Sequence, residues 1–198
     1  MTAPSIKTGN DALLSLLAYL RRQDYRHMTI TPLTHAHVLA NRAGTGGVTL
    51  RDLFGWNLPF DKQAFPTELV NLMQEAGVLE AHGQQWRSKV RVSSIDNALF
   101  LHSGYPTEQE DAVFFGPDTY RFVRFMRQAL AASPLRRHAR ILDIGCGSGA
   151  GGLMLARQCE DADLVLNDIN PLALQYCAVN ASGLGLDATL VQTSSLAA

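Results

Sequence analysis

The chain has 198 residues, of which 46% are hydrophobic and 18% are charged. It carries 17 Lys and Arg against 18 Asp and Glu, which leaves a formal net charge of -1 at pH 7. This composition is ordinary for a globular protein and is sufficient for one large domain or two small ones. No apolar run approaches the roughly 18 residues of a membrane-spanning helix, so we expect no membrane partner.

The N-terminal segment and the cysteines bear on the location of the protein. The opening sequence MTAPSIKTGND lacks the charged-then-apolar pattern of a signal peptide, so we expect a cytoplasmic protein. The three cysteines, Cys146, Cys159 and Cys177, are odd in number and have no C-x-x-C spacing. This argues against a disulfide framework and against a zinc ribbon, and we expect no metal site.

The first two predicted elements are helices. Leucines at helical spacing predict a helix over Asp11–Arg22. Thr31 followed by Pro32 is typical of a helix start and predicts a second helix, which carries His35 and His37. Because residues two positions apart point to different faces of a helix, we expect these histidines to be surface side chains and not a metal pair.

The following stretch has the order of elements of a winged-helix module. The patterns predict a short helix over Thr49–Phe54, a longer helix over Glu68–Glu75 ended by Gly77, and strands over Val78–Ala81 and Gln85–Ser93 around a turn at His82–Gly83. We therefore expect residues 1–112 to form an α+β, winged-helix-like module. A junction rich in Gly, Pro and acidic residues, Ser103–Asp111, closes this part of the chain.

Three basic residues alternate with apolar residues in the predicted hairpin. On a strand, Arg87, Lys89 and Arg91 share one face, which suits either a phosphate-binding wing or a solvated surface. Residues 1–104 hold ten Lys and Arg against eight Asp and Glu, a net charge of only +2. That charge is far below the footprint of a dedicated nucleic-acid binder, so we favour the solvated surface.

The second part of the chain is organised around the stretch Ile141–Ala156, ILDIGCGSGAGGLMLA. Apolar residues predict a buried parallel strand, and three alternate glycines, Gly145, Gly147 and Gly149, then break it. Glycines at this spacing allow a tight turn and a close approach of the backbone to a ligand. A helix follows from Ala150, so the stretch predicts the first βα unit of a doubly wound fold.

Asp143 helps to separate two cofactors that such a turn can bind. The glycines alone also satisfy the dinucleotide fingerprint G-x-G-x-x-G/A, so a nicotinamide cofactor remains an alternative. A carboxylate two residues before the first glycine is costly to bury unless a positive charge accompanies it. S-adenosylmethionine brings an ammonium and a sulfonium, and Asp143 therefore favours that cofactor.

A second acidic residue follows the next predicted strand, Ala162–Leu166. Asp168 lies about 20 residues beyond the glycine turn, where ribose hydroxyls are bound in doubly wound folds. Asn170 and Pro171 then predict a helix start. A third strand is predicted over Ala188–Gln192, and the sequence ends six residues later.

At this point the motif Asp143 to Gly149, D-I-G-C-G-S-G, resembles the first motif of class I S-adenosylmethionine-dependent methyltransferases. The stretch Asp168 to Asn180, D-I-N-P-L-A-L-Q-Y-C-A-V-N, is similar to the small-domain methylases and the release-factor glutamine methyltransferases. The resemblance implies S-adenosyl-L-methionine as cofactor, bound by Asp143, Gly145, Cys146, Gly147, Gly149, Asp168, Ile169 and Asn170. For Cys146 we expect a small residue that fits the turn and not a nucleophile.

The same resemblance implies methyl transfer to a nitrogen of a macromolecule. The acceptor is then a protein, such as a release factor or a ribosomal component, or a base of RNA or DNA. Two alternatives remain: an NAD-dependent oxidoreductase, and a non-catalytic winged-helix binding protein.

The resemblance also shows what this sequence lacks. The catalytic Asn-Pro-Pro-Tyr motif of these methylases is absent, so we name no catalytic residue. Only three strands and two helices fit between Ile141 and Ala198, whereas a doubly wound sheet has about six strands. We therefore expect residues 113–198 to form the first half of a Rossmann-like methyltransferase domain, inactive in this chain and prone to self-association through an unpaired sheet edge.

Overall fold

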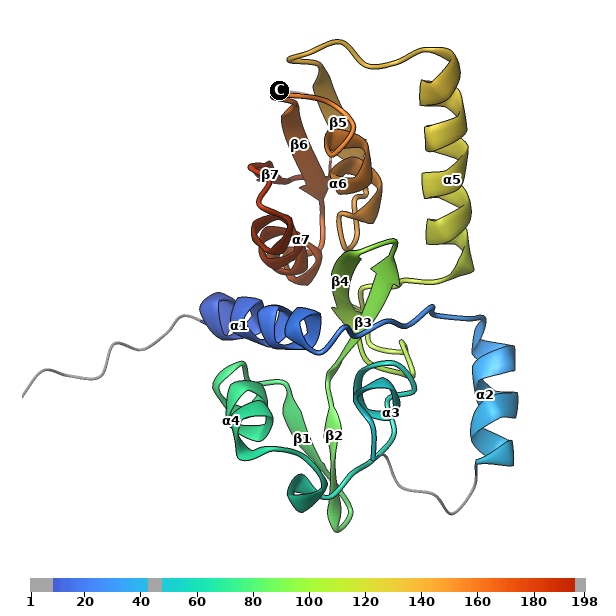
Figure 1. Ribbon diagram of the computed structural model, residues 1–198, viewed down its shortest axis with the longest axis vertical. Helices are drawn as coiled ribbons and strands as arrows, with labels where there is room; N and C mark the ends of the chain where they lie inside the picture. Colours follow the sequence, from blue (N-terminus) through green and yellow to red (C-terminus); the bar gives the residue numbers. More distant parts are fainter. Residues whose placement is uncertain (1–8, 43–47, 195–198) are drawn as a thin grey trace, which may run out of the picture.

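The computed structural model describes residues 9–42 and 48–194. The elements are helices α1 (Gly9–Arg22), α2 (Pro32–Asn41), α3 (Leu50–Phe54), α4 (Thr67–Glu75), α5 (Pro117–Ala132), α6 (Ala150–Ala156) and α7 (Pro171–Leu184), the 3-10 helix η1 (Lys62–Ala64), and strands β1 (Leu79–His82), β2 (Gln85–Ser88), β3 (Val90–Ile95), β4 (Ala98–Ser103), β5 (Arg140–Ile144), β6 (Asp163–Asp168) and β7 (Thr189–Gln192). Figure 1 shows their arrangement in space. The protein is an α/β structure, as the sequence predicts.

The helices of the N-terminal part begin and end close to their predicted positions. The leucine face of α1 is buried, and α1 packs on α4 and on α7. Thr31 caps α2 by accepting a hydrogen bond from the backbone N–H of Thr34 at 3.2 Å. Thr49 and Asp52 form a reciprocal capping box at the start of α3, so the first turn of this short helix is fixed by local hydrogen bonds.

The predicted strand Gln85–Ser93 was wrong, because this stretch forms two strands that belong to two different sheets. β2 pairs with β1, whereas β3 pairs with β4 in an antiparallel hairpin that the sequence analysis missed. The side chain of Ser88 causes the break, since its hydroxyl bonds to both the N–H and the carbonyl of Val90. Such a local hydrogen bond replaces the ladder at this point.

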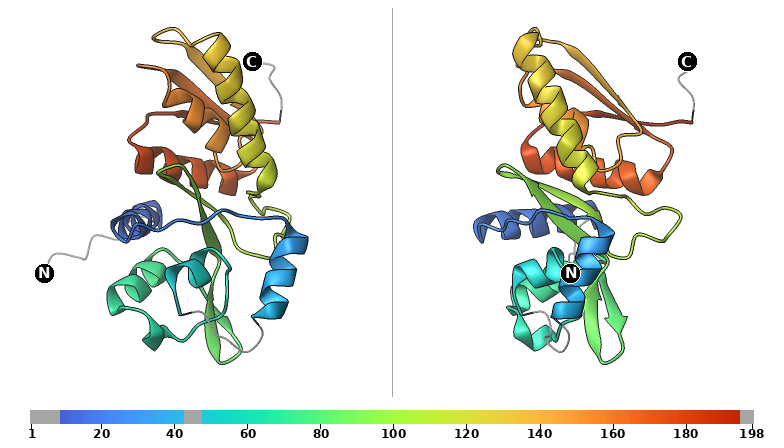
Figure 2. Two further views of the ribbon diagram at one scale, coloured as in Figure 1. Left: turned by 45° about the vertical axis from the view of Figure 1, so that its right-hand side comes forward. Right: turned by 90° about the vertical axis from the view of Figure 1, so that its right-hand side faces the viewer.

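The C-terminal part contains a three-stranded parallel sheet of order β5-β6-β7. Helices α6 and α7 form the crossovers and pack on one face, while α5 lies beside α6 (Figure 2). Leu142 and Ile144 point to the opposite face and are 54% and 56% exposed. All three predicted strands are present, and the carboxyl ends of β5 and β6 lie side by side. The prediction that the first of them is buried was wrong, because α6 and α7 both pack on the other face of the sheet and only Ile141 of β5 is buried.

The two parts of the chain share their hydrophobic cores. One core joins α1, α4 and the hairpins to Ala173, Tyr176 and Val179 of α7. The other joins Phe100 of β4 to the buried side chains of α6 and β6. Helix α1 therefore runs between α4 and α7 (Figure 1), and no helix within residues 9–42 or 48–194 is long and apolar enough to cross a membrane.

Two expectations about polar side chains were wrong. His35 is only 1% exposed and contacts the rings of Trp56 and Tyr105 in tilted arrangements, whereas His37 is exposed as predicted. Arg91 is only 4% exposed and donates from Nε to the carbonyl of Gly55 at 2.9 Å. Both side chains are buried because the α2 segment and the loop at Tyr105 pack over this face of β3, which an isolated hairpin would leave in solvent.

Candidate functional site

The glycine turn connects β5 to α6 with a backbone that requires glycine. Gly145, Gly147 and Gly149 have φ values of 66°, 54° and 77°, in the left-handed region that side chains disfavour. A Cβ atom at Gly145 or Gly147 would meet nothing within 4 Å, so the turn is open to a ligand there. At Gly149 a Cβ would lie 2.9 Å from the Cys177 sulfur, so this glycine serves packing.

Asp143 lies at the carboxyl end of β5 and under the first turn of α6. Its Oδ2 accepts a hydrogen bond from the backbone N–H of Gly152 at 2.8 Å. Burial raises the pKa of Asp143, the Gly152 N–H opposes that rise, and the nearby charge of Asp168 adds to it. A positive charge in the site would favour the ionised carboxylate, because opposite charges lower the pKa of an acid.

Asp168 lies at the end of β6 and binds the glycine turn. Its Oδ2 accepts from the Gly147 N–H at 2.9 Å, and its Oδ1 accepts from the Asn170 N–H at 2.9 Å. Each oxygen of a carboxylate has a second lone pair, so both can still accept a hydrogen bond from a ligand. Asn170 caps α7 through its Oδ1, which accepts from the Leu172 N–H at 2.9 Å.

These groups surround a pocket of about 430 Å³. Six of the eight residues that the sequence analysis assigned to the cofactor contribute to its wall, whereas Gly149 and Ile169 do not, and Ile169 is 66% exposed. The pocket is lined by Ala112, Val113, Phe114, Asp118, Thr119, Phe122, Asp143, Gly145, Cys146, Gly147, Ser148, Ala150, Gly151, Asp168, Asn170 and Ala173.

The start of α5 supplies a wall that glycine and acid motifs could not reveal. Phe122 lies so close to α6 that a Cβ at Gly151 would meet its ring at 2.9 Å. Thr119 accepts from the Gly116 N–H at 3.4 Å and so caps the helix while it lines the pocket.

Asn180 supports the site from α7. Its side chain is fully buried and donates from Nδ2 to the carbonyls of Leu101 and Ser148 at 3.1 and 2.9 Å. One amide therefore binds both the N-terminal hairpin and the glycine turn. The sequence analysis singled out Asn180 only through the family resemblance.

The cysteines at the turn are packing residues. The sulfur atoms of Cys146 and Cys177 lie 3.5 Å apart, and the Cys177 thiol donates to the carbonyl of Gly147 at 3.2 Å. Its contact with Cys146 and its burial raise the pKa of Cys177, which keeps this thiol protonated and unreactive. In the part of the chain that the structure describes, no group of three or more His, Cys, Asp or Glu could hold a metal ion.

Comparison with known proteins agrees with this geometry. Residues 122–198 match the family described as the methyltransferase small domain. The chain is 42% identical over 72 residues to a release factor glutamine methyltransferase of Agrobacterium fabrum, a match that covers 36% of this chain and 25% of that protein. It is 40% identical over 70 residues to the protein of the same name from Deinococcus radiodurans, with 34% and 25% covered.

The fold, the site and these matches support a class I S-adenosylmethionine-dependent methyltransferase domain in the C-terminal part of the chain. The resemblance inferred from the sequence is thereby confirmed, and the methyltransferase is favoured over the oxidoreductase. The matched region is about a quarter of the length of these curated relatives. Among solved structures, the 16S rRNA N2 G1207 methyltransferase of T. thermophilus, in complex with AdoMet and guanosine, overlaps with a TM-score of 0.41 at 17% identity, covering 69% of this chain and 41% of that one.

Proposed function

We propose that the protein binds S-adenosylmethionine in the pocket beside the glycine turn and methylates the amide nitrogen of a glutamine side chain in a protein. The observation that carries the proposal is the pair of carboxylates, Asp143 and Asp168, at the ends of neighbouring parallel strands with the glycine turn between them. Ligands of open α/β sheets bind outside the carboxyl ends of the strands.

The residues of the pocket suit this cofactor. Gly145 and Gly147 leave open space where a side chain would stand, and the volume is within the usual range of small-molecule sites. Asp143 offers a negative charge to a ligand ammonium, and the free lone pairs of Asp168 suit a pair of ribose hydroxyls. Asn170 lies at the pocket wall, and Ile169 is exposed beside it.

Methyl transfer depends more on the placement of the acceptor than on acid–base groups. S-adenosylmethionine supplies a methyl group on an already activated sulfonium, so holding the acceptor in line contributes most of the rate enhancement. In this chain, Phe114, Phe122 and the start of α5 narrow the pocket beside the glycine turn. Those side chains exclude water from one wall and so help to fix the orientation of a bound ligand.

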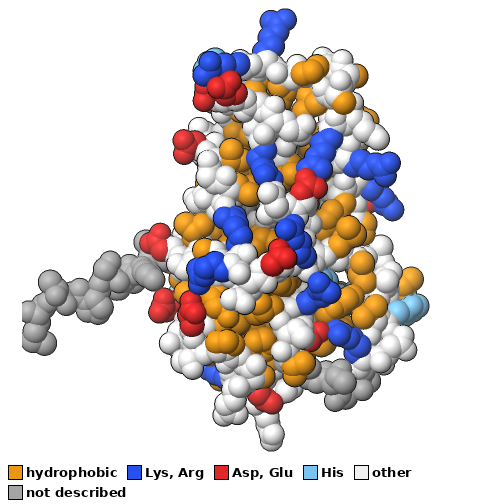
Figure 3. Space-filling view, in the orientation of Figure 1, with side chains coloured by type: hydrophobic (Ala, Val, Ile, Leu, Met, Phe, Trp, Pro, Cys, Tyr) orange, Lys and Arg blue, Asp and Glu red, His pale blue; other side chains and the backbone are white. Residues whose placement is uncertain are grey.

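The acceptor class rests on the relatives, which are named for glutamine methylation of release factors. The one face displayed in Figure 3 is compatible with a protein acceptor. Figure 3 shows Lys and Arg side chains interspersed with acidic and apolar ones on the displayed face, without one continuous basic tract. A nucleic-acid acceptor would favour such a tract, because phosphate contacts supply most of the affinity for nucleic acids.

The same proposal gives the N-terminal part a role in recognising the acceptor. Residues 1–112 contain α3, α4 and the β1–β2 hairpin in the order of a winged-helix-like module, and we assign to this module the recognition of the acceptor. Residues 113–198 then form the cofactor-binding domain. The cytoplasmic location expected from the sequence belongs to this proposal as well.

The test is a methyl-transfer assay with a defined acceptor. Because residues 1–198 alone are expected to be inactive, a fusion of these residues to the second half of a related methyltransferase domain is incubated with S-adenosylmethionine labelled on its methyl group, together with a purified release factor or with total RNA. We expect label in the release factor and none in a variant of it whose acceptor glutamine is replaced by alanine. Label in RNA alone, or tight binding of NAD with no binding of S-adenosylhomocysteine in calorimetry, would contradict the proposal.

A further inference from the structure

A second cavity lies where the N-terminal part of the chain meets the C-terminal part. Its volume is about 370 Å³, which is within the range of small-molecule sites, and its wall includes the β1–β2 hairpin, the loop 104–112 and helix α7. Ala112 lines both this cavity and the pocket beside the glycine turn. A ligand in the second cavity therefore lies next to the candidate cofactor site, and we call this cavity the junction pocket.

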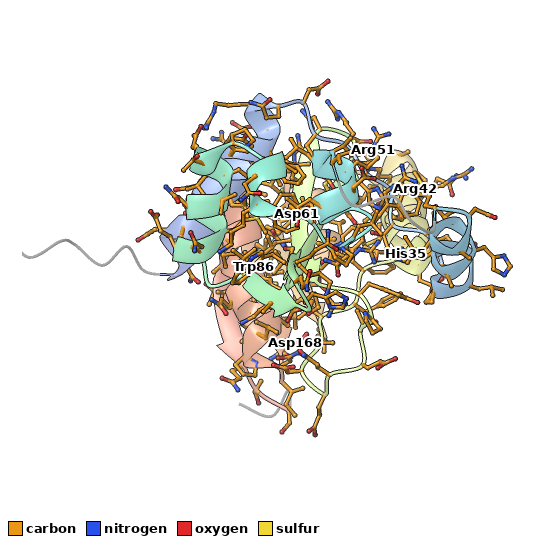
Figure 4. All side chains as sticks on the ribbon, turned by 90° about the horizontal axis from the view of Figure 1, so that it is seen from below. His35, Arg42, Arg51, Asp61, Trp86 and Asp168 are labelled. Atoms are coloured by element: carbon orange, nitrogen blue, oxygen red, sulfur yellow. The ribbon has the colours of Figure 1, made fainter. Side chains whose placement is uncertain are left out.

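The β1–β2 hairpin presents a charged face to the junction pocket. Glu80 and Arg87 are directly opposite each other, and the Arg87 Nε donates to the Glu80 Oε1 at 2.9 Å. Their side chains are 32% and 27% exposed, so this ion pair is partly withdrawn from solvent. Successive residues of a strand point to opposite faces. Trp86, labelled on the hairpin in Figure 4, packs against the hydrophobic core, and Arg87 is therefore on the face that lines the pocket.

Lys89 adds a positive charge that has no acidic partner. It lines the junction pocket and is exposed, and within residues 9–42 and 48–194 no ion pair joins it to an acid. Its N–H donates to the Val78 carbonyl at 2.7 Å, and its carbonyl accepts from the Gly104 N–H at 2.8 Å. Because the backbone of Lys89 is held on both sides, the base of this side chain is fixed at the wall of the pocket.

The junction pocket is held in shape by hydrogen bonds between its walls. Asn57 is only 5% exposed; its Nδ2 donates to the Ser88 carbonyl at 2.8 Å, and its Oδ1 accepts from the Tyr105 N–H at 2.6 Å. One side chain thus joins the hairpin to the start of the loop 104–112. Near the end of this loop, the Asn170 Nδ2 donates to the Asp111 carbonyl at 2.7 Å. The loop is therefore fixed between the hairpin and the start of α7.

The balance of charge in the wall favours an anionic ligand with a single charge. Arg87 and Lys89 are positive and Glu80 is negative, which leaves one positive charge in excess. A carboxylate matches this excess, whereas a phosphate group brings about two negative charges close to Glu80. The loop also carries three acids that are exposed and do not contribute to the wall: Glu108, Glu110 and Asp111.

Two amide side chains in the wall suit a polypeptide ligand. Gln109 and Gln175 both line the junction pocket, and the Gln175 Nε2 donates to the Asn10 Oδ1 at 2.9 Å, which leaves the Gln175 carbonyl oxygen able to accept a hydrogen bond. A carboxamide offers a donor and an acceptor, as the backbone of a bound peptide requires. The cavity therefore combines an excess positive charge with groups that pair with a peptide backbone.

We propose that the junction pocket binds an acidic side chain of the acceptor protein. The proposal rests on the proposed function, since it takes the acceptor to be a polypeptide, and it names the side chain that the acceptor presents beside the cofactor pocket. The carboxylate pairs with Lys89 and with the guanidinium N–H groups of Arg87 that Glu80 leaves free. Because the two pockets share a wall, an acceptor held in this way lies beside the glycine turn.

The first experiment measures the binding of blocked peptides to the 198-residue chain by nuclear magnetic resonance. Acetyl-Gly-Glu-Gly-amide and acetyl-Gly-Gln-Gly-amide are titrated separately, and the backbone amide signals of Gly77 and Gly104, which line the junction pocket, are followed. We expect saturable shifts with the glutamate peptide, and an affinity about 3-fold higher than that of the glutamine peptide, because ion pairs at partly exposed positions contribute modestly.

Two variants change the charge of the wall in opposite directions. Lys89→Met removes the unpaired positive charge and should weaken binding of the glutamate peptide by about 3-fold. Glu80→Gln removes the negative charge beside Arg87 and should strengthen binding by about the same factor. A gain in affinity does not arise from a damaged fold, so the two variants separate charge recognition from a structural effect. Arg124→Met, at an exposed position outside this wall, is the control and should bind as the wild type does.

A second experiment separates this proposal from the proposed function. A purified release factor and S-adenosylhomocysteine are each titrated calorimetrically into the wild type, Lys89→Met and Glu80→Gln. We expect the affinity for the release factor to change as the affinity for the glutamate peptide does. The affinity for S-adenosylhomocysteine should be equal in the three proteins, since neither residue lines the cofactor pocket. If the glutamate peptide binds as expected and the release factor does not bind, the acidic-peptide site stands and the release factor is the wrong acceptor.

Four results would overturn the proposal. They are no saturable shift of Gly77 and Gly104 with the glutamate peptide, equal affinities for the two peptides, a stronger response to inorganic phosphate than to the glutamate peptide, or a release factor that binds equally to the wild type, Lys89→Met and Glu80→Gln. Binding of S-adenosylhomocysteine that persists in these cases would leave the cofactor assignment intact.

Discussion

Asn180 and Leu101 exchange two hydrogen bonds although 79 positions separate them in the sequence. The Asn180 Oδ1 accepts from the Leu101 N–H at 2.8 Å, and its Nδ2 donates to the Leu101 carbonyl at 3.1 Å. The amide side chain therefore acts as a strand partner for the edge of β4. Because the same Nδ2 also donates to Ser148, this contact joins the N-terminal hairpin to the turn of the candidate cofactor site.

Replacement of Asn180 by alanine should destabilise the protein. The change leaves the backbone groups of Leu101 and Ser148 buried without their partner, and we expect a loss of about 2–4 kcal/mol in the free energy of unfolding. Urea denaturation measures this loss. Asn41→Ala, which removes one exposed hydrogen bond to the His37 carbonyl, is the control and should change stability by less than about 0.5 kcal/mol. Equal effects of the two changes would contradict the role assigned to Asn180.

The carboxylates make a second prediction, about cofactor affinity. Asp168→Ala should weaken the binding of S-adenosylhomocysteine by about 2–4 kcal/mol, because charge-assisted hydrogen bonds in a half-buried site are lost. Asp143→Asn keeps an oxygen for the Gly152 N–H but removes the charge. It should weaken S-adenosylhomocysteine more than 5′-methylthioadenosine, which has no ammonium group.

Calorimetric titration of the three proteins tests both changes. Asp187→Ala is the matched control, since Asp187 is an exposed acid beyond the end of α7. Unchanged affinity in both Asp143→Asn and Asp168→Ala would show that the cofactor binds elsewhere.

The sequence predicted the C-terminal part well because its determinants are local. A short apolar strand, glycines that adopt positive φ and an asparagine cap each act within a few residues, and Asp143 and Asp168 converge because parallel strands end at one edge. The wall that contains Phe122 escaped prediction. It depends on the packing of α5 against α6, which no pattern within α5 specifies.

The N-terminal part was harder to predict for a related reason. The alternation of polar and apolar residues in Gln85–Ser93 correctly predicted strand structure. The Ser88 hydroxyl divides this stretch into two strands, and the division becomes visible only in the tertiary pairing of β3 with β4. Arg91 lies on a face of β3 and His35 on a face of α2 that would each contact solvent if the element stood alone. They are buried because segments distant in the sequence cover them, and burial of such groups cannot be inferred from period or composition.

A third prediction compares two helical glycines. In Gly152→Ala the new Cβ would lie 2.8 Å from a Leu166 methyl and 3.1 Å from Asp143 Oδ2, so we expect a loss of about 1–3 kcal/mol in unfolding free energy from overpacking. In Gly183→Ala the nearest atom would lie 3.4 Å away, on the flexible side chain of Leu17. Higher helix propensity should then leave stability unchanged or raise it by up to about 1 kcal/mol. Thermal denaturation of both variants measures these changes in stability. Equal changes in the two variants would contradict the close approach of α6 to Asp143.

The exposed sheet face makes a fourth prediction. Leu142 and Ile144 stand on the face opposite α6 and α7, and more than half of each side chain is exposed. We expect self-association that rises with protein concentration, since adjacent exposed apolar residues on a sheet favour contact with another surface. Sedimentation equilibrium should show weaker association for Leu142→Lys than for the wild type. Leu33→Lys, at a 68% exposed position on α2, should associate as the wild type does.

The last prediction concerns the dependence of stability on pH. Burial, aided by the nearby charge of Arg91, lowers the pKa of His27 to about 3 and that of His35 to about 4. In the unfolded chain these histidines have a pKa of about 6.5. Below that pH the unfolded chain binds protons that the folded chain does not bind, so the free energy of unfolding falls as the pH falls. Once the unfolded histidines are protonated, each of these groups should contribute a loss of up to about 1.4 kcal/mol per pH unit.

Urea denaturation between about pH 7 and pH 5 measures this slope, because most carboxylates remain ionised in that range. His35→Gln removes one of the groups and should flatten the slope, whatever its effect on stability near pH 7. His37→Gln, at the exposed position two residues further along α2, is the control and should leave the slope unchanged. A slope that is identical in all three proteins would show that His35 takes up its proton without resistance from its surroundings.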